Sequence, residues 1–197
     1  MFVTLEGIEG SGKSTLLSGL AERLRASGRE PLVTREPGGT ALGDAIRAIF
    51  LDRSLDISAL SEAMLVNAAR AQHVERTIRP ALAQGRIVLC DRFVDSTLAY
   101  QGYGRGLDLA MLRGLCDAAT AGLVPDVTFV LDVPLAVSRA RTAARRPELD
   151  RLEAEDDAFH QRVREGFLAL ARSPQHRLLD GELDASALVA SAMEALC

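Results

Sequence analysis

The sequence has few of the residues that build disulfide-rich, membrane-spanning or nucleic-acid-binding proteins. It has no tryptophan and only 4% aromatic residues, and its three cysteines are scattered, odd in number and without metal-ligand spacing. The cysteines therefore predict reduced thiols in a cytoplasmic protein. A formal net charge of −4 argues against a nucleic-acid surface as the main function. No uncharged apolar run is long enough to cross a bilayer, and the short N-terminal apolar run, soon followed by Glu6 and Glu9, predicts no signal peptide.

The order of apolar and helical segments predicts a single domain over residues 1–197. The composition, 48% hydrophobic and 25% charged, is typical of a globular protein, and no repeat or Pro/Gly/Ser linker divides the chain. Short apolar runs alternate with helical patterns, which predicts an α/β fold with a parallel sheet flanked by helices. The expected strands are 2–6, 31–34, 86–91, 127–134 and 176–180. The expected helices are 13–26, 41–51, 58–83, 107–120, a segment that ends near 145, 154–172 and 184–196.

The segment GIEGSGKST, residues 7–15, lies between the first expected strand and the first expected helix. In that context, the spacing G-x-x-x-x-G-K-S is the pattern of a phosphate-binding loop. Its glycines let backbone N–H groups turn toward phosphate oxygens, and the helix start adds the positive end of its dipole. We expect Lys13 to reach the β- and γ-phosphates of a nucleoside triphosphate. The expected triphosphate-binding residues are Gly7, Ile8, Glu9, Gly10, Ser11, Gly12, Lys13, Ser14 and Thr15.

Two residues near the loop are candidate ligands of Mg²⁺. The hydroxyl of Ser14 is the usual metal ligand of such loops. Asp91 ends an expected buried strand and is the second candidate, although a helix cap is an equally good interpretation of this carboxylate. The chain has no N-K-x-D motif of the kind that reads guanine, which disfavours a GTPase.

Three further segments make the function more specific: TREPGGT (34–40), RAQH (70–73) and DRFVDSTLAYQGYGRG (91–106). Together with LEGIEGSGKST, they resemble the signatures of bacterial thymidylate kinase. The resemblance extends into a short arginine-rich lid at about 139–153 and more loosely to the C-terminus. It implies a phosphate-loop NTPase fold like that of nucleoside monophosphate kinases, with a five-stranded parallel sheet. It also implies a homodimer that phosphorylates dTMP to dTDP with the γ-phosphate of ATP and Mg²⁺, a step of dTTP synthesis.

The resemblance also locates the site of the acceptor phosphate. Transfer between two nucleotides needs positive charge at both ends, because donor and acceptor oxygens repel each other. By resemblance, Arg70 and Arg92 bind the acceptor phosphate. A solvated helix residue is the alternative interpretation of Arg70, since Arg76 and Arg79 lie on nearby turns. The expected dTMP-binding residues are Glu9, Glu36, Pro37, Val66, Arg70, Arg92, Ser96, Thr97, Tyr100 and Gln101.

The segment STLAYQG carries the expected contacts to the base and sugar. Thr97 and Gln101 have side chains that can hydrogen-bond the edge of a pyrimidine, and in the family the residue at Tyr100 disfavours a 2′-hydroxyl. The alternative is that these polar residues close a helical turn and Tyr100 packs in the core. Glu36 and Pro37 are expected on the sugar side, where the family has a cis peptide bond that this sequence leaves undecided.

An acidic residue in the phosphate loop is unexpected because it would repel the phosphates of ATP. We therefore expect Glu9 to point across to the acceptor, as in the family, where an acid at this place lies near the sugar 3′-hydroxyl and the metal shell.

The segment RARTAARRPELDRLE, residues 139–153, is rich in arginine and is the expected lid. A lid that closes over the triphosphate excludes water and adds arginines to the transferring phosphoryl group. This matches the family type with arginines in the lid and none in the phosphate loop. A solvated basic helix face is the alternative interpretation. The expected catalytic residues are Lys13, Glu9, Arg92, Arg146 and Arg151.

Two other functions remain open at this point. One is a kinase of a different acceptor, such as another deoxynucleoside monophosphate, shikimate or gluconate, which would not require the DR…AYQG segment. The other is a nucleotide-binding sensor without activity, which the joint presence of Lys13, Ser14, Arg92 and the lid arginines disfavours.

Val66 departs from the family, which usually has a thymine-stacking phenylalanine four residues before the helix arginine. Valine offers less area and no π-face, so either Phe93 or Tyr103 supplies the stack or the base binds more weakly. We predict that Val66→Phe tightens dTMP binding, as measured by calorimetry. An unchanged or weaker affinity would mean that another side chain already stacks on the base.

Overall fold

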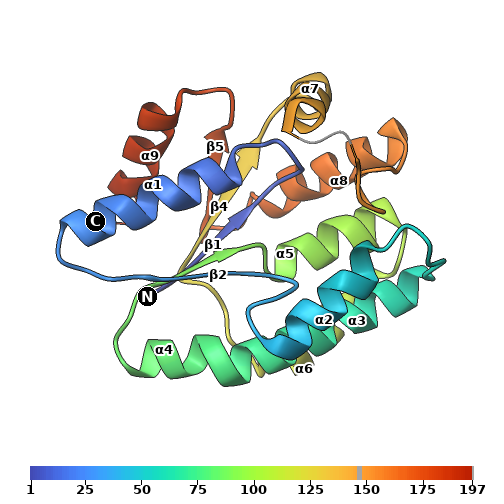
Figure 1. The fold of residues 1–197 in the computed structure, drawn as a ribbon, viewed down its shortest axis with the longest axis horizontal. Helices are drawn as coiled ribbons and strands as arrows, with labels where there is room; N and C mark the ends of the chain where they lie inside the picture. Colours follow the sequence, from blue (N-terminus) through green and yellow to red (C-terminus); the bar gives the residue numbers. More distant parts are fainter. Residues whose placement is uncertain (146–147, 197) are drawn as a thin grey trace.

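The fold is built on a parallel sheet with the strand order β2-β3-β1-β4-β5 (Figure 1). This computed structural model describes residues 1–145 and 148–196. All four neighbouring strand pairs are parallel, so the carboxyl ends of the strands lie along one edge of the sheet. The strands are β1 (Phe2–Glu6), β2 (Leu32–Arg35), β3 (Val88–Asp91), β4 (Val127–Asp132) and β5 (His176–Asp180). The predicted five-stranded α/β fold is confirmed.

Helices cover both faces of the sheet, with α1 and α9 on one side and α3, α4 and α6 on the other (Figure 1). The helices are α1 (Lys13–Ala26), α2 (Ala41–Leu51), α3 (Ala59–His73), α4 (Arg79–Ala83), α5 (Val94–Thr97), α6 (Leu109–Thr120), α7 (Leu135–Arg145), α8 (Asp157–Leu170) and α9 (Ala185–Glu194). Two π-helical turns, η1 (Val74–Ile78) and η2 (Leu98–Gly104), continue α3 and α5. No helix in the described ranges is long and apolar enough to cross a membrane.

The structure corrects the expected elements in two places. The single helix expected over 58–83 is interrupted by η1. Pro80 is the second residue of α4, just after this turn. A proline has no N–H and collides with the carbonyl four residues earlier, so the helix widens there. The second correction is that 94–104, for which no element was expected, forms α5 and η2.

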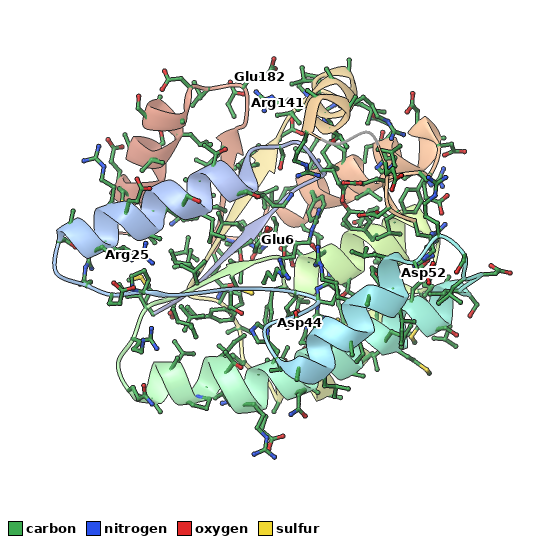
Figure 2. The ribbon with its side chains drawn as sticks, viewed as in Figure 1. Glu6, Arg25, Asp44, Asp52, Arg141 and Glu182 are labelled. Carbon is green, nitrogen blue, oxygen red and sulfur yellow. The ribbon has the colours of Figure 1, made fainter. Side chains whose placement is uncertain are left out.

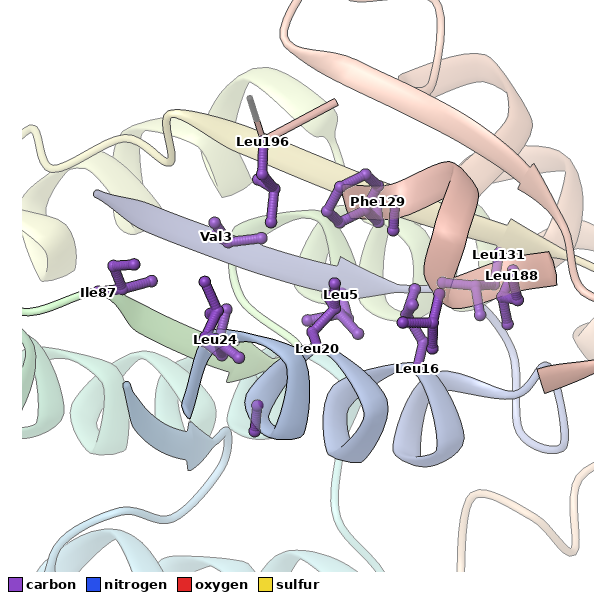
Figure 3. Close-up of a cluster of buried hydrophobic side chains, with 14 residues drawn as sticks. Val3, Leu5, Leu16, Leu20, Leu24, Ile87, Phe129, Leu131, Leu188 and Leu196 are labelled. Atoms are coloured by element: carbon purple, nitrogen blue, oxygen red, sulfur yellow. The ribbon is translucent and has the colours of Figure 1, made fainter. Parts of the chain in front are cut away.

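The core follows from the two-residue repeat of the strands. Val3, Leu5, Phe129 and Leu131 face α1 and α9, where they pack with leucines such as Leu16 in one buried cluster (Figure 3). The strand residues that alternate with those of this cluster, such as Phe2 and Val88, face η1 and α4 on the other side of the sheet. Burial of each large apolar side chain stabilises the fold by about 1.5–3 kcal/mol.

Helix α8 lies unusually close to η2 because glycines occupy the contact. A Cβ atom on Gly166 of α8 would lie 2.7 Å from ring carbons of Tyr103, and one on Gly104 would lie 2.7 Å from the Phe159 ring. These distances are shorter than real side chains allow. The contact therefore requires hydrogen in place of a side chain, and it holds η2 against the sheet.

Candidate functional site

A cleft of about 720 Å³ opens at the carboxyl edge of the sheet, where ligands of open α/β sheets bind. The phosphate loop, the ends of β2 and β3, α3, α5 and η2 line it, together with parts of α7 and of the segment before α8. The predicted site residues that line it are Glu9, Gly10, Ser11, Gly12, Lys13, Ser14, Thr15, Glu36, Pro37, Val66, Arg70, Asp91, Arg92, Ser96, Thr97, Tyr100 and Gln101. Gly7, Ile8 and Arg151 belong to the described residues but not to this lining.

The phosphate loop encloses a buried ammonium group. Gly7 has φ +135°, and a Cβ atom there would lie 2.4 Å from the carbonyl oxygen of Leu131, so only glycine fits. Lys13 Nζ donates to the carbonyl oxygens of Gly7 and Ile8, both at 2.9 Å. Burial, with a smaller contribution from the charge of Arg92, lowers the pKa of Lys13 to about 8. The ammonium is therefore poorly stabilised until an anion enters the loop.

Arg92 joins the phosphate loop to the segment after β3. Its backbone has φ +71°, a left-handed conformation that costs a non-glycine residue about 1–3 kcal/mol. One Nη atom donates to Gly7 O at 3.0 Å and Ser96 Oγ at 3.1 Å. The other donates to Glu9 Oε1 at 2.8 Å and Tyr100 Oη at 3.2 Å. These bonds hold the strained backbone in place and aim the guanidinium into the cleft.

Glu9 is ionised and points toward these partners, away from the phosphate positions of the loop. Burial alone would raise its pKa, but the charges of Arg92 and Lys13 and a hydrogen bond from Tyr100 lower it overall. The hydroxyl of Tyr100 donates to Glu9 Oε1 at 2.5 Å while its ring packs 6.0 Å from that of Phe167. Tyr100 thus has its ring in the core and its hydroxyl at the cleft.

Glu6 is a site residue that the sequence analysis missed. It lies near the carboxyl end of β1, at the centre of Figure 2, and accepts from Phe93 N at 2.7 Å and Ser96 Oγ at 2.6 Å. Burial, reinforced by the nearby charge of Asp95, raises its pKa to about 7. The sequence feature that could have identified Glu6 as a site residue is its position as an acid at the end of an otherwise apolar strand. Glu6 fixes the turn that carries Arg92.

Arg70 is buried, which rules out the solvated alternative. Its Nε donates to Glu36 Oε2 at 2.8 Å, and its Nη atoms donate to Phe93 O at 2.9 Å and Thr97 Oγ1 at 3.1 Å. The second oxygen of Glu36 is 3.0 Å from Nδ1 of the buried His73, a residue to which the sequence analysis assigned no role. The peptide bond after Glu36 is cis.

The apolar wall of the cleft contains Val66, Phe50 and Phe93. Of the two aromatic residues considered for stacking, Phe93 lines the cleft, whereas Tyr103 packs against α8 and does not line the cleft. One face of the Phe93 ring is covered by the Arg70 guanidinium, whose central carbon lies 5.3 Å from the ring centroid. Phe50, at the end of α2, had no predicted role.

Within the described residues, two lid arginines line the cleft, and neither is one for which a catalytic role was expected. Arg141 on α7, labelled in Figure 2, donates to Gly10 O at 3.2 Å and Gly181 O at 2.8 Å. Arg145 also lines the cleft and donates to Glu153 Oε1 at 2.9 Å. Arg141 thus contacts the phosphate loop directly.

The expected lid residue Arg151 lies elsewhere. Its guanidinium donates to Phe50 O and to the buried carboxylate of Glu62, and it lies over the Phe50 ring. The sequence could not reveal this partner, because Glu62 lies 89 positions away in the chain. Arg146, the other expected lid residue, lies outside the described residues.

The predicted Mg²⁺ ligands fit a small hard cation. Asp91 and Ser14 line the same cleft, and Asp91 Oδ1 is buried with no hydrogen-bond partner among the described residues. A buried carboxylate oxygen without a partner destabilises the fold unless a cation or a hydrogen-bond donor contacts it. Mg²⁺ is commonly held by one or two protein oxygens together with substrate phosphates and water.

The family model described as thymidylate kinase matches residues 5–191 of the chain. The chain belongs to the thymidylate kinase family. Its relatives include the thymidylate kinases of Pseudomonas fluorescens, 52% identical over all of this chain and 92% of the relative, and of Deinococcus radiodurans, 52% identical over 91% and 86%. A crystal structure of thymidylate kinase from Ehrlichia chaffeensis superposes with a TM-score of 0.80 at 33% identity, covering 100% of this chain and 98% of that one. The resemblance seen in the sequence is thereby confirmed.

The lowered pKa of Lys13 generates a prediction for this thymidylate kinase family member. Above about pH 8 the lysine is neutral in the free protein, and bound phosphates raise its pKa, so ATP binding must take up a proton. We expect the affinity for ATP to fall between about pH 8 and about pH 9.5, by at most about tenfold per pH unit. Calorimetry in buffers of different ionisation enthalpy measures this uptake. Lys13→Arg should abolish the pH dependence, and an unchanged dependence in that variant would contradict the assignment to Lys13.

Proposed function

We propose that the chain transfers the γ-phosphate of ATP to dTMP, giving dTDP and ADP with Mg²⁺, in dTTP synthesis. The observation that carries the proposal is the contact of Arg92 with both Gly7 and Glu9, which joins the donor loop to the acceptor segment in one cleft. Membership of the thymidylate kinase family supports the same reaction.

Lys13 and the lid act on the donor. The ammonium of Lys13 leaves the carbonyl oxygens of the loop and pairs with the β- and γ-phosphates. Arg141 and Arg145 line the cleft, and we assign them the charge stabilisation expected of lid arginines, a role that the sequence had suggested for Arg146 and Arg151. Closure of this segment excludes water and so prevents hydrolysis of ATP.

Arg70 and Arg92 act on the acceptor. Both guanidinium groups line the cleft on the side of α3 and η2, where they offer positive charge and N–H donors to a monophosphate. A monophosphate oxygen is already a competent nucleophile, so the reaction needs alignment and charge stabilisation rather than a general base. Glu36 keeps Arg70 in place through the 2.8 Å ion pair.

When Mg²⁺ is bound, it neutralises charge that develops between the phosphates. Ser14 and Asp91 would hold the ion at the end of β3 beside the loop.

Thr97 and Gln101 face the base, and Tyr100 and Glu9 face the sugar. The hydroxyl of Tyr100 and the carboxylate of Glu9 form one hydrogen-bonded pair, which leaves little room for a ribose 2′-hydroxyl and offers an acceptor to the 3′-hydroxyl. The pair therefore favours deoxynucleotides.

We further propose a cytoplasmic homodimer that binds ATP and dTMP, and neither nucleic acid nor membranes. Leu60 and Met64 on α3 are 44% and 54% exposed, and Met111 on α6 is 39% exposed. Helices α3 and α6 pack side by side, so these side chains form an apolar strip that a second subunit would cover.

A panel of acceptors tests the proposed reaction. We expect ADP release with dTMP to exceed that with dUMP, dCMP, AMP and shikimate when all are measured at equal concentration. Tight ATP binding without turnover of any acceptor would support a nucleotide sensor instead. If dUMP equalled or exceeded dTMP, the assignment of thymine would fail.

The orientation of Glu9 generates a second prediction. Glu9→Ala removes the partner of Arg92 and Tyr100 at the sugar side but leaves the loop backbone that holds the triphosphate. We expect KM for dTMP to rise and kcat to fall by about tenfold or more, with ATP affinity changed little. Equal losses for both substrates would show that Glu9 only supports the loop.

A further inference from the structure

Glu62 is a buried carboxylate that does not line the cleft. It is 0% exposed, and three donors from distant parts of the chain surround it. Gln101 Nε2 donates to Oε2 at 3.0 Å, Arg105 Nη2 donates to Oε1 at 2.9 Å, and Arg151 Nη1 also donates to Oε1. The two arginines form ion pairs with the carboxylate, as a buried charged group requires.

The bond to Gln101 fixes which end of its amide meets a ligand. A glutamine amide has a carbonyl oxygen that accepts and an NH₂ group that donates, and the two can exchange places by a flip. With Nε2 held by Glu62, the carbonyl Oε1 is the end left to accept from a base in the cleft. A flip would place two acceptor oxygens about 3 Å apart, with loss of a charge-assisted hydrogen bond.

The orientation of this amide distinguishes pyrimidines. Thymine and uracil carry a donor, N3–H, at the centre of the edge that pairs in DNA, whereas cytosine carries an acceptor, N3, at that place. A carbonyl that faces the base accepts from N3–H and repels the N3 lone pair. A site with a fixed acceptor rejects the wrong partner strongly because the buried group is then left unpaired.

We propose that Glu62 is a positioning residue that selects bases with an N3–H group by fixing the amide of Gln101. The proposal rests on the proposed function, in that Gln101 meets the base of the acceptor. Glu62 acts only through Gln101, while Arg105 and Arg151 hold the Glu62 carboxylate in place through ion pairs.

The variant Glu62→Gln tests this role. Arginines only donate, so the carbonyl of the introduced amide must face Arg105 and Arg151, and its NH₂ group then faces residue 101. Gln101 is forced to flip and presents NH₂ to the base. We expect the ratio of kcat/KM for dTMP to that for dCMP to fall by about tenfold or more. An equal loss for both acceptors, with the ratio unchanged, would mean that Glu62 only supports the fold and would overturn the proposal.

A second substitution restores the original polarity. In Glu62→Gln combined with Gln101→Glu, the introduced amide donates to a carboxylate that again presents an acceptor to the base. We expect the preference for dTMP over dCMP to return toward that of the wild type. A double variant no more selective than Glu62→Gln would contradict the proposal.

Arg105→Lys is the matched control, because it weakens the ion pair with Glu62 but leaves the carboxylate and the amide in place. We expect its selectivity to stay within about twofold of the wild type. A shift as large as that of Glu62→Gln would assign the effect to loss of the ion pair and overturn the proposal.

Two outcomes separate this proposal from the proposed function. If no acceptor is turned over by the wild type, the proposed function fails. If dTMP is turned over but wild-type kcat/KM is equal for dCMP, the fixed amide fails while the kinase remains, and this result does not depend on the folding of any variant.

Discussion

The ion pair between Arg92 and Glu9 is the interaction on which the rest of the site depends. It joins two segments that lie 83 residues apart, the phosphate loop after β1 and the turn after β3. The pair forms because β1 and β3 are parallel neighbours, so that both loops leave the sheet at the same edge. Without it, Glu9 would be a buried charge that keeps only the hydrogen bond from Tyr100 beside the phosphate loop.

Three buried carboxylates support this pair and the other polar groups of the cleft. Glu6 fixes the turn that carries Arg92, Glu36 holds Arg70, and Glu62 holds Gln101. Each acid takes its donors from at least one segment distant in the chain. A site that binds two polyanions thus keeps its cations and amides in position with carboxylates packed against them, which limits the repulsion among the positive groups before substrate binds.

The sequence predicted the sheet and the donor loop well because both depend on local patterns. Apolar runs locate the strands, and the spacing from Gly7 to Ser14 specifies the loop within one segment. The turn η2 was not predicted, since π-helical geometry has no strong residue signal. The partner of Arg151 could not be predicted either, because its choice between phosphate and Glu62 depends on how α3 packs beside the segment that precedes α8. Glu6 and His73 were missed for the same reason, as their roles arise only from long-range contacts.

The glycine contact between α8 and η2 limits which substitutions this sequence tolerates. Gly166 lies outside the cleft, yet its partner Tyr103 belongs to η2, the same turn that carries the acceptor residues Tyr100 and Gln101. Any side chain at position 166 would push the two helical segments apart and move the pyrimidine-reading residues with them. Acceptor choice therefore depends on a position that does not contact a nucleotide, and only glycine fits at that position.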